Sequence, residues 1–261
     1  MKIAVCQMDA AINDQEERLC EIERSAFEAA EEGARILVFP ELAVTGYGAG
    51  EMIASLAESF EESPVLARLS ALAKKLELAM VVGVALKQAD HVFNAGVFLT
   101  PDGSRTAYSK VQLYGTYEKD LFQPGDAPSL IVEFEGLKLG FLVCFDVEFP
   151  ERTRDLAMRG ANLVLVPTAL PKSSAGAFIA GSVVPVRAFE SQIFIAYANH
   201  CGADQSFAYQ GRSCVAAPDG ALLASASMNA ELLFADIKPQ AYEHSRKQNP
   251  YLDELVNFDP A

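Results

Sequence analysis

The chain has 261 residues, of which 51% are hydrophobic and 21% charged, enough for one large α/β domain or two small ones. Its formal net charge of −14 argues against nucleic acid or an anionic membrane surface as a partner. No segment approaches the roughly eighteen apolar residues of a membrane span, and the N-terminal apolar run is too short for a signal peptide. We therefore expect a cytoplasmic protein whose five scattered cysteines stay reduced.

The first half of the chain predicts strands that alternate with amphipathic helices. Residues 2–7 form a buried strand, and Asn13 or Asp14 caps a helix that runs to Ala30. A second helix begins at Ser63 and Pro64 and places leucines at helical spacing on one face. Further strands are expected at 35–41, 79–87, 92–100 and 105–110.

The second half predicts more strands, two hairpins and a polar, aromatic loop at 112–126. A helix at 177–192 contains Pro185, which should kink or divide it. The other expected elements are hairpin strands at 129–133 and 137–143, a helix after Cys144 to about residue 159, strands at 163–167, 193–199 and 232–237, and a turn at 218–220.

The pattern of elements predicts a single α/β domain over residues 1–261. Apolar strands flanked by amphipathic helices, with hairpins between them, indicate two sheets packed face to face and covered by helices outside. The polar tail at 239–261 carries isolated apolar residues. We expect this tail to lie across a neighbouring part of the fold or a partner subunit.

Residues 140–151, GFLVCFDVEFPE, change from an apolar strand to an acidic segment directly after Cys144, and Pro150 is placed to begin a helix. A strand that turns into a helix leaves its last residue in a tight corner near free backbone N–H groups. Such a corner favours a nucleophilic thiolate. Burial of Cys144 in the core is the alternative interpretation.

Two other predicted strands also end in reactive groups, Glu41 and Lys110. In α/β sheets, chemistry gathers at the carboxyl ends of strands. A thiol needs a base, a leaving amine needs an acid, and a developing oxyanion needs a cation or N–H donor. Each residue has an ordinary alternative, a solvated loop glutamate or a surface lysine, but their joint occurrence favours a catalytic set.

Several blocks of the chain resemble the nitrilase superfamily of carbon–nitrogen hydrolases. The main ones are FPELAVTGY (39–47), the lysine within YSKVQLYGTYEKDLFQPG (108–125) and GFLVCFDVEFPE; GANLVLVPTA, YANHCG and GRSCVAAPDG follow in order. The resemblance covers nearly the whole chain, to Ile237. It implies a four-layer αββα sandwich with two mixed sheets, no metal or organic cofactor, and assembly into homodimers or larger homo-oligomers. In the family the helix at 151–159 and the tail often form the interface.

The resemblance also implies roles for individual residues. Cys144 is expected to be the nucleophile that forms a thioester, and Glu41 the general base. Lys110 and the backbone N–H of Phe145 are expected to stabilise the oxyanion. Glu118 matches a second family glutamate that orients substrate and Lys110, although a structural ion pair explains it equally well.

Other residues near these motifs are expected to have structural or pocket-lining roles. Asp146 and Arg154 are expected to tie the nucleophile corner to its helix. Adjacent strand residues point to opposite faces, so His200 and Cys201 are expected to be structural. Acidic residues near Glu118 and Glu148 hint at a cationic substrate, but the overall charge favours a solvated acidic face. The residues expected to line a substrate pocket, with core packing as the alternative, are Tyr47, Tyr114, Phe145, Thr168 and Ala169.

The residues after the cysteine favour one reaction within the superfamily. Nitrilases typically carry Trp-Glu there, whereas this chain has Phe145-Asp146 and no tryptophan. The resemblance therefore favours an amidase acting on a small aliphatic or amino-acid-derived amide. An N-carbamoyl hydrolase is the main alternative, followed by a nitrilase, an acyltransferase, or a catalytically silent binding protein that keeps the fold.

Overall fold

The computed structural model describes residues 1–126 and 129–256 and contains two β-sheets. The first sheet is built from β1 (Lys2–Asp9), β2 (Ile36–Val38), β3 (Ala79–Gln88), β4 (His91–Leu99), β5 (Arg105–Ser109), β10 (His200–Cys201) and β13 (Glu231–Asp236). Its strand order is β10-β1-β2-β3-β4-β5, and β13 pairs with β1 in antiparallel register.

The second sheet has six strands in the order β12-β11-β9-β8-β7-β6. They are β6 (Ile131–Phe134), β7 (Leu137–Phe141), β8 (Leu163–Pro167), β9 (Phe194–Ala198), β11 (Cys214–Ala216) and β12 (Leu222–Ser225). Both sheets are mixed, because parallel pairs such as β1–β2 and β8–β9 adjoin antiparallel hairpins.

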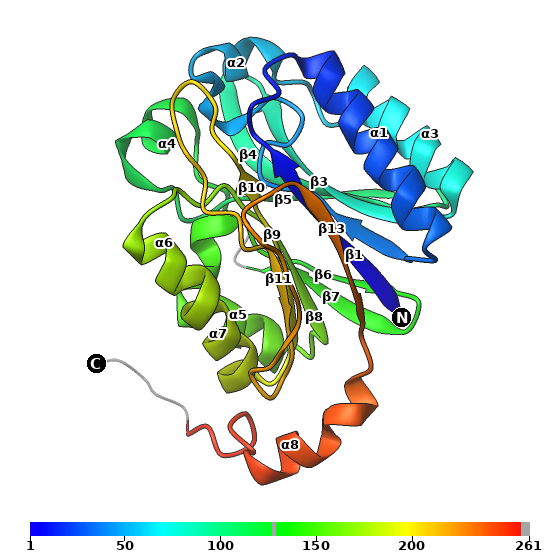
Figure 1. Ribbon diagram of the computed structural model, residues 1–261, viewed down its shortest axis with the longest axis vertical. Coiled ribbons are helices and arrows are strands. Elements are labelled where there is room, and N and C mark those ends of the chain that lie inside the picture. The colour runs from blue at the N-terminus through cyan, green and yellow to red at the C-terminus, as the bar shows by residue number, and fades with distance from the viewer. Residues whose placement is uncertain (127–128, 257–261) are drawn as a thin grey trace.

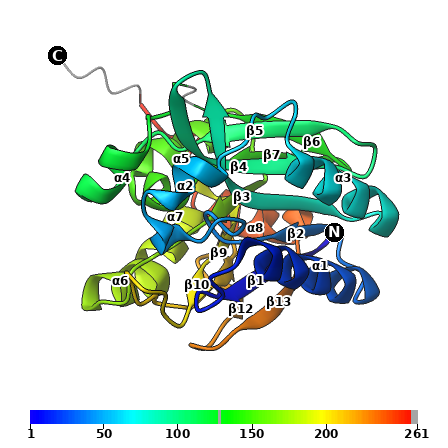
Figure 2. The ribbon, with the colours of Figure 1, turned by 90° about the horizontal axis from the view of Figure 1, so that it is seen from above.

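Helices cover the outer faces of both sheets. On one side lie α1 (Gln15–Glu31) and α3 (Pro64–Leu76), and on the other lie α5 (Pro150–Met158) and α7 (Val184–Ser191) (Figures 1 and 2). This confirms the expected four-layer arrangement. Both helix starts on the first side are also confirmed: Asp14 accepts two backbone N–H bonds, and Ser63 accepts one from Leu66.

The alternation of β1 shows how the layers share one strand. Ile3 and Val5 belong to the core between the two sheets. Ala4 and Cys6 point the other way and join the core beneath α1 and α3. Since successive strand residues face opposite sides, a strand covered on both sides reads as a continuous apolar run.

The region expected to be a loop at 112–126 contains a helix, α4 (Gly115–Leu121). The prediction was wrong because its buried position is a charged residue, Glu118, so no apolar stripe marks the helix. Two short helical segments, α2 (Met52–Leu56) and a 3₁₀ turn at Tyr47–Ala49, also went unpredicted.

The helix expected around Pro185 is divided, as predicted. It consists of α6 (Ser174–Phe178), a π-helical segment Ile179–Val183, and α7 with Pro185 in its first turn. At that position the missing N–H of proline costs little. The π segment joins the two helices into one arm that flanks the second sheet (Figure 1).

The tail contains a 3₁₀ turn (Pro239–Tyr242) and α8 (Glu243–Gln248). Both pack against the chain's own second sheet and the end of α7. The ring of Tyr242 lies 5.1 Å from that of Phe194 on β9, and Arg246 donates to the backbone oxygen of Gln192. Contact between this tail and a partner subunit stays a prediction. The prediction for the tail extends to residues 257–261, which lie outside the described residues.

Candidate active site

The first sheet brings two of the expected residues, Glu41 and Lys110, into direct contact. Glu41 follows β2 by three residues, and Lys110 directly follows β5. Both side chains have no exposed surface, and Lys110 Nζ lies 2.7 Å from Glu41 Oε1. Expected strand 35–41 ends earlier, at Val38, so Glu41 stands on a turn beyond the sheet rather than within it.

Lys110 is also paired with Glu118 on α4, whose Oε1 lies 2.6 Å from Nζ. Glu118 accepts two further hydrogen bonds, from the Tyr47 hydroxyl at 2.8 Å and from the Tyr114 N–H at 2.8 Å. Burial disfavours the ammonium of Lys110, but the carboxylates around it outweigh this cost and hold its pKa above the ordinary value. Lys110 is therefore a fixed cation.

One carboxylate oxygen of Glu41 is left free for chemistry. Oε1 accepts from Asn94 Nδ2 at 2.7 Å as well as from Lys110. Oε2 is buried and has no hydrogen-bond partner among the described residues. Burial raises the pKa of Glu41, and the neighbouring carboxylate of Glu118 adds to the rise. A carboxyl group tuned upward in this way suits proton transfer near neutral pH.

Cys144 lies at the corner after β7, as predicted, and begins a 3₁₀ segment, Cys144–Glu148, that precedes α5. Its φ angle is +47°, a left-handed conformation that a side chain other than glycine adopts at a cost. The turn leaves early N–H groups such as that of Phe145 without an intrahelical partner. Strain held in place at such a corner is typical of a residue positioned for function.

The corner is fastened by Asp146. Its Oδ2 accepts from the Tyr108 hydroxyl at 3.0 Å and from the Val143 N–H at 3.1 Å, and its Oδ1 accepts from the Gln112 N–H at 2.8 Å. The structural role expected of Asp146 is thus present, and its partners come from the corner itself, from β5 and from the loop after β5. In the described ranges the side chain of Arg154 makes no hydrogen bond or ion pair, so nothing in the structure supports the tie expected of Arg154.

Cys144 is nearly buried, with 6% of its surface exposed. Burial raises the pKa of the Cys144 thiol well above its ordinary value, and the nearby Glu41 carboxylate raises it further. Lys110 and the backbone N–H of Ala169 act in the opposite direction. The resting group is therefore a thiol that must pass its proton to a base as it attacks.

Buried groups fix the backbone of Glu41 through hydrogen bonds to its carbonyl oxygen and its N–H. His200 Nε2 donates to the Glu41 carbonyl oxygen at 2.8 Å, and the Glu41 N–H donates to the Thr168 carbonyl. On β3, a Cβ added at Gly83 would lie 2.2 Å from the Pro40 carbonyl oxygen. His200 is structural, as expected, yet it touches the main chain of the expected base.

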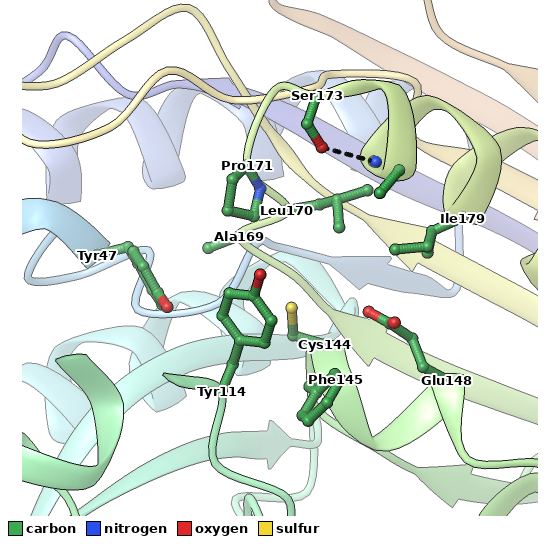
Figure 3. A pocket seen from close by; sticks show the side chains of 12 residues that line it. Tyr47, Tyr114, Cys144, Phe145, Glu148, Ala169, Leu170, Pro171, Ser173 and Ile179 are labelled. Atoms are coloured by element: carbon green, nitrogen blue, oxygen red, sulfur yellow. Dashed lines mark hydrogen bonds between the residues drawn. The ribbon is translucent and has the colours of Figure 1, made fainter. Parts of the chain in front are cut away.

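A cavity of about 190 Å³ opens above the cysteine. The Cys144 sulfur points into it between Tyr114 and Glu148 (Figure 3). Four residues expected in the lining are found there: Tyr47, Tyr114, Phe145 and Ala169. Thr168 is not among the lining residues; it is fully buried, and its hydroxyl donates to the Val166 carbonyl.

The acidic residues of this region divide into two groups. Asp120 and Glu151 are exposed, as expected, but Glu118 and Glu148 are not on a solvated face, so the expectation was wrong for these two. Glu118 has no exposed surface. Glu148 is half-buried and lines the cavity. Glu118 is buried because it pairs with Lys110 and Tyr47, whereas Glu148 ends a 3₁₀ turn where a helix from Cys144 was expected.

The family model for carbon–nitrogen hydrolases matches residues 2–247. The chain belongs to this family. It is 36% identical over 259 residues to a protein named "Hydrolase in pqqF 5'region" from Pseudomonas protegens, covering 97% of this chain and 88% of the relative. A protein named nitrilase from Pyrococcus abyssi is 30% identical, with 88% and 87% covered.

Among solved structures, an amidase from Nesterenkonia sp. AN1 superposes on this carbon–nitrogen hydrolase with a TM-score of 0.87 at 34% identity, covering 98% of this chain and 96% of that one. Further structures of the Nesterenkonia amidase show acrylamide added covalently to its active-site cysteine and butyramide bound to a variant lacking that cysteine. These similarities show a cysteine-dependent carbon–nitrogen hydrolase with amidase-like relatives.

Sequence reasoning missed one polar residue of the hydrolase site, Asn94. It lies in the interior of β4 and is 1% exposed, with its amide on Glu41. An asparagine inside the otherwise apolar run VFNAGVFL is the signal that could have marked it. Across residues 1–126 and 129–256 there is no helix that could cross a membrane and no group of three side chains suited to hold a metal ion.

Proposed function

We propose that this carbon–nitrogen hydrolase is an amidase that converts a small amide to a carboxylate and ammonia through a thioester on Cys144. The observation that carries the proposal is the buried set of Glu41, Lys110 and Glu118 beneath a strained cysteine at the cavity floor. Burying three charges costs free energy even when they are paired, so their presence here indicates a role in catalysis. The amidase neighbours support the choice of amides.

The first half of the reaction forms the acyl-enzyme. The Cys144 thiol transfers its proton to Glu41 Oε2 while the sulfur attacks the amide carbon. The carbonyl electrons move to oxygen, and the Lys110 ammonium and the Phe145 N–H stabilise the oxyanion. As the carbonyl re-forms, the carbon–nitrogen bond breaks and Glu41 returns its proton to the nitrogen, which leaves as ammonia.

The second half releases the acid. Water enters the space that ammonia has left and gives a proton to Glu41 as its oxygen attacks the thioester carbon. The second tetrahedral oxyanion uses the same two donors, and its collapse breaks the carbon–sulfur bond. The proton on Glu41 then returns to the sulfur, so one carboxylate serves as base and acid in both halves.

Glu118 has a positioning role in this scheme. It accepts a hydrogen bond from the Lys110 ammonium, which also contacts Glu41, and another from the Tyr47 hydroxyl at the cavity wall. Because Glu118 Oε1 is shared between an ammonium and a phenol, loss of the carboxylate would loosen both groups.

The test measures ammonia release from propanamide, butanamide and amino-acid amides, alongside N-carbamoyl compounds and nitriles. The wild-type protein should release ammonia from amides, and Cys144→Ala should not. Mass spectrometry of the protein with fluoroacetamide should place one adduct on Cys144 and leave the exposed Cys20 free. Equal ammonia release by Cys144→Ala, or release from ureido compounds or nitriles alone, would overturn the proposal.

A further inference from the structure

One carboxylate, Glu148, faces the cavity from the wall beside Cys144. Most of the residues drawn in Figure 3 are apolar or aromatic, among them Phe145, Leu170 and Ile179. The hydroxyl of Ser173 in the same wall is already bonded to the Gly176 N–H. Among the described residues, Glu148 is thus the one lining side chain with a carboxyl group or any other strongly acidic or basic group.

Within the described ranges, the Glu148 carboxylate has no hydrogen bond or ion pair. One of the two cations whose charge reaches it, Arg187, is already occupied. Its guanidinium donates to the backbone carbonyls of Val147 and Glu148 at 3.1 and 2.7 Å and to the Glu190 carboxylate at 2.8 Å. Arg187 therefore fixes the backbone under Glu148 and leaves the side chain facing the cavity.

A carboxylate in this position is unfavourable while the cavity contains only neutral groups. Burial raises the pKa of Glu148, and the positive charges of Lys110 and Arg187 offset only part of the rise. Lys110 is committed to Glu41 and Glu118. A cation delivered into the cavity by the substrate would supply the missing partner, in surroundings where a charged hydrogen bond is strong.

We propose that Glu148 forms an ammonium-binding subsite, so that the substrate is a small amide whose acyl group carries a protonated amine. The inference deepens the proposed amidase function and rests on it for the position of the scissile carbon. The amide end binds above Cys144, the amine lies against Glu148, and the methylene groups between them pack on the apolar wall. The protein's net charge of −14 also attracts cations.

The test compares amides of equal size that differ in charge. Three pairs span the acyl length: glycinamide with propanamide, 3-aminopropanamide with butanamide, and 4-aminobutanamide with pentanamide, all at pH 7. For at least one pair, the wild type should prefer the cationic amide by about tenfold or more in kcat/KM, as loss of a charged hydrogen bond implies. Glu148→Gln should abolish that preference, because it should lower kcat/KM for the cationic member at least tenfold more than for the neutral member.

Glu151→Gln is the matched control, because Glu151 is exposed on α5 and does not line the cavity. It removes the same charge from the same stretch and should keep the preference. A wild type that hydrolyses the neutral amides better in every pair would overturn the subsite while leaving the amidase function standing. Equal losses for both members of a pair in Glu148→Gln would also overturn it.

A binding experiment separates failure of the subsite from failure of the function. Calorimetry measures n-propylammonium chloride against propan-1-ol, first with the wild type and then with Glu148→Gln. Binding of the ammonium alone, lost in Glu148→Gln, supports the subsite even if no amide is hydrolysed. Equal binding by both proteins, or no binding by the wild type, would overturn it whatever the amidase assays show.

Discussion

Lys110 Nζ lies 2.7 Å from Glu41 Oε1, and neither side chain has any exposed surface. With Glu118 Oε1 at 2.6 Å from the same ammonium, the group holds two carboxylates and one cation. Removing the cation alone therefore leaves two buried like charges, which is more costly than removing all three. Stability therefore depends on the balance of charge within the group, whereas the proposed catalysis requires all three side chains.

The first prediction separates these two dependences. Lys110→Met should lower the free energy of unfolding by about 3–5 kcal/mol, because it strands the carboxylates. The triple variant Lys110→Met/Glu41→Gln/Glu118→Gln should recover at least half of that loss and remain inactive. Urea unfolding and ammonia release measure the two properties. A triple variant less stable than Lys110→Met would contradict the account.

The second prediction concerns the proton carried by Glu41. Glu41→Gln should lower kcat/KM for the best amide by about 10³-fold or more, since it removes acid and base together. In the wild type, the acid limb of kcat/KM against pH should fall above the ordinary carboxyl pKa of 4.5, because burial raises the pKa of Glu41. Asn94→Ala, which removes a donor to the charged form, should move that limb further upward. An unmoved limb would show that another group titrates.

The third prediction uses two glycines that pair across β3 and β4. A Cβ at Gly83 would lie 2.2 Å from the Pro40 carbonyl and 2.7 Å from Glu41 Cα, whereas at Gly96 the nearest atom is 3.5 Å away. Gly83→Ala should therefore displace Glu41 and abolish ammonia release, and Gly96→Ala should keep most of it. Activity and urea midpoints of the two variants decide this. Comparable activity in both variants would contradict the prediction, because it would mean that the turn after β2 shifts without displacing Glu41.

The sequence predicted the sandwich because its strands and helices carry regular apolar patterns, as in β1 and α3. It indicated Glu41, Lys110 and Cys144 as candidates because each stands at or near the end of a predicted strand and within a motif that resembles the family. The sequence could not predict side-chain positions that depend on tertiary contacts. Glu118 is buried on a helix without an apolar stripe, and Glu148 faces the cavity because a 3₁₀ turn follows Cys144. Thr168 turns inward beneath the cavity that it was expected to line.

The last prediction concerns stability in mild acid and rests on His200. Burial, with a contribution from Arg18, lowers the pKa of His200 from 6.5 to about 4. Below pH 6.5, His200 is therefore protonated in the unfolded chain but stays neutral in the folded protein. The free energy of unfolding thus falls as the pH drops toward 4. Between pH 7.5 and 4.5 this single group should cost about 2.5 kcal/mol of unfolding free energy.

His200→Gln isolates this contribution, because glutamine does not titrate and can still donate to the Glu41 carbonyl. Urea unfolding of both proteins at pH 7.5, 6.0 and 4.5 gives the comparison, in which the carboxylates common to both cancel. The wild type should lose about 2.5 kcal/mol more than the variant over this range, nearly all of it below pH 6.5. If both proteins lose the same unfolding free energy, His200 is protonated as readily in the folded state as in the unfolded chain, which would contradict the prediction.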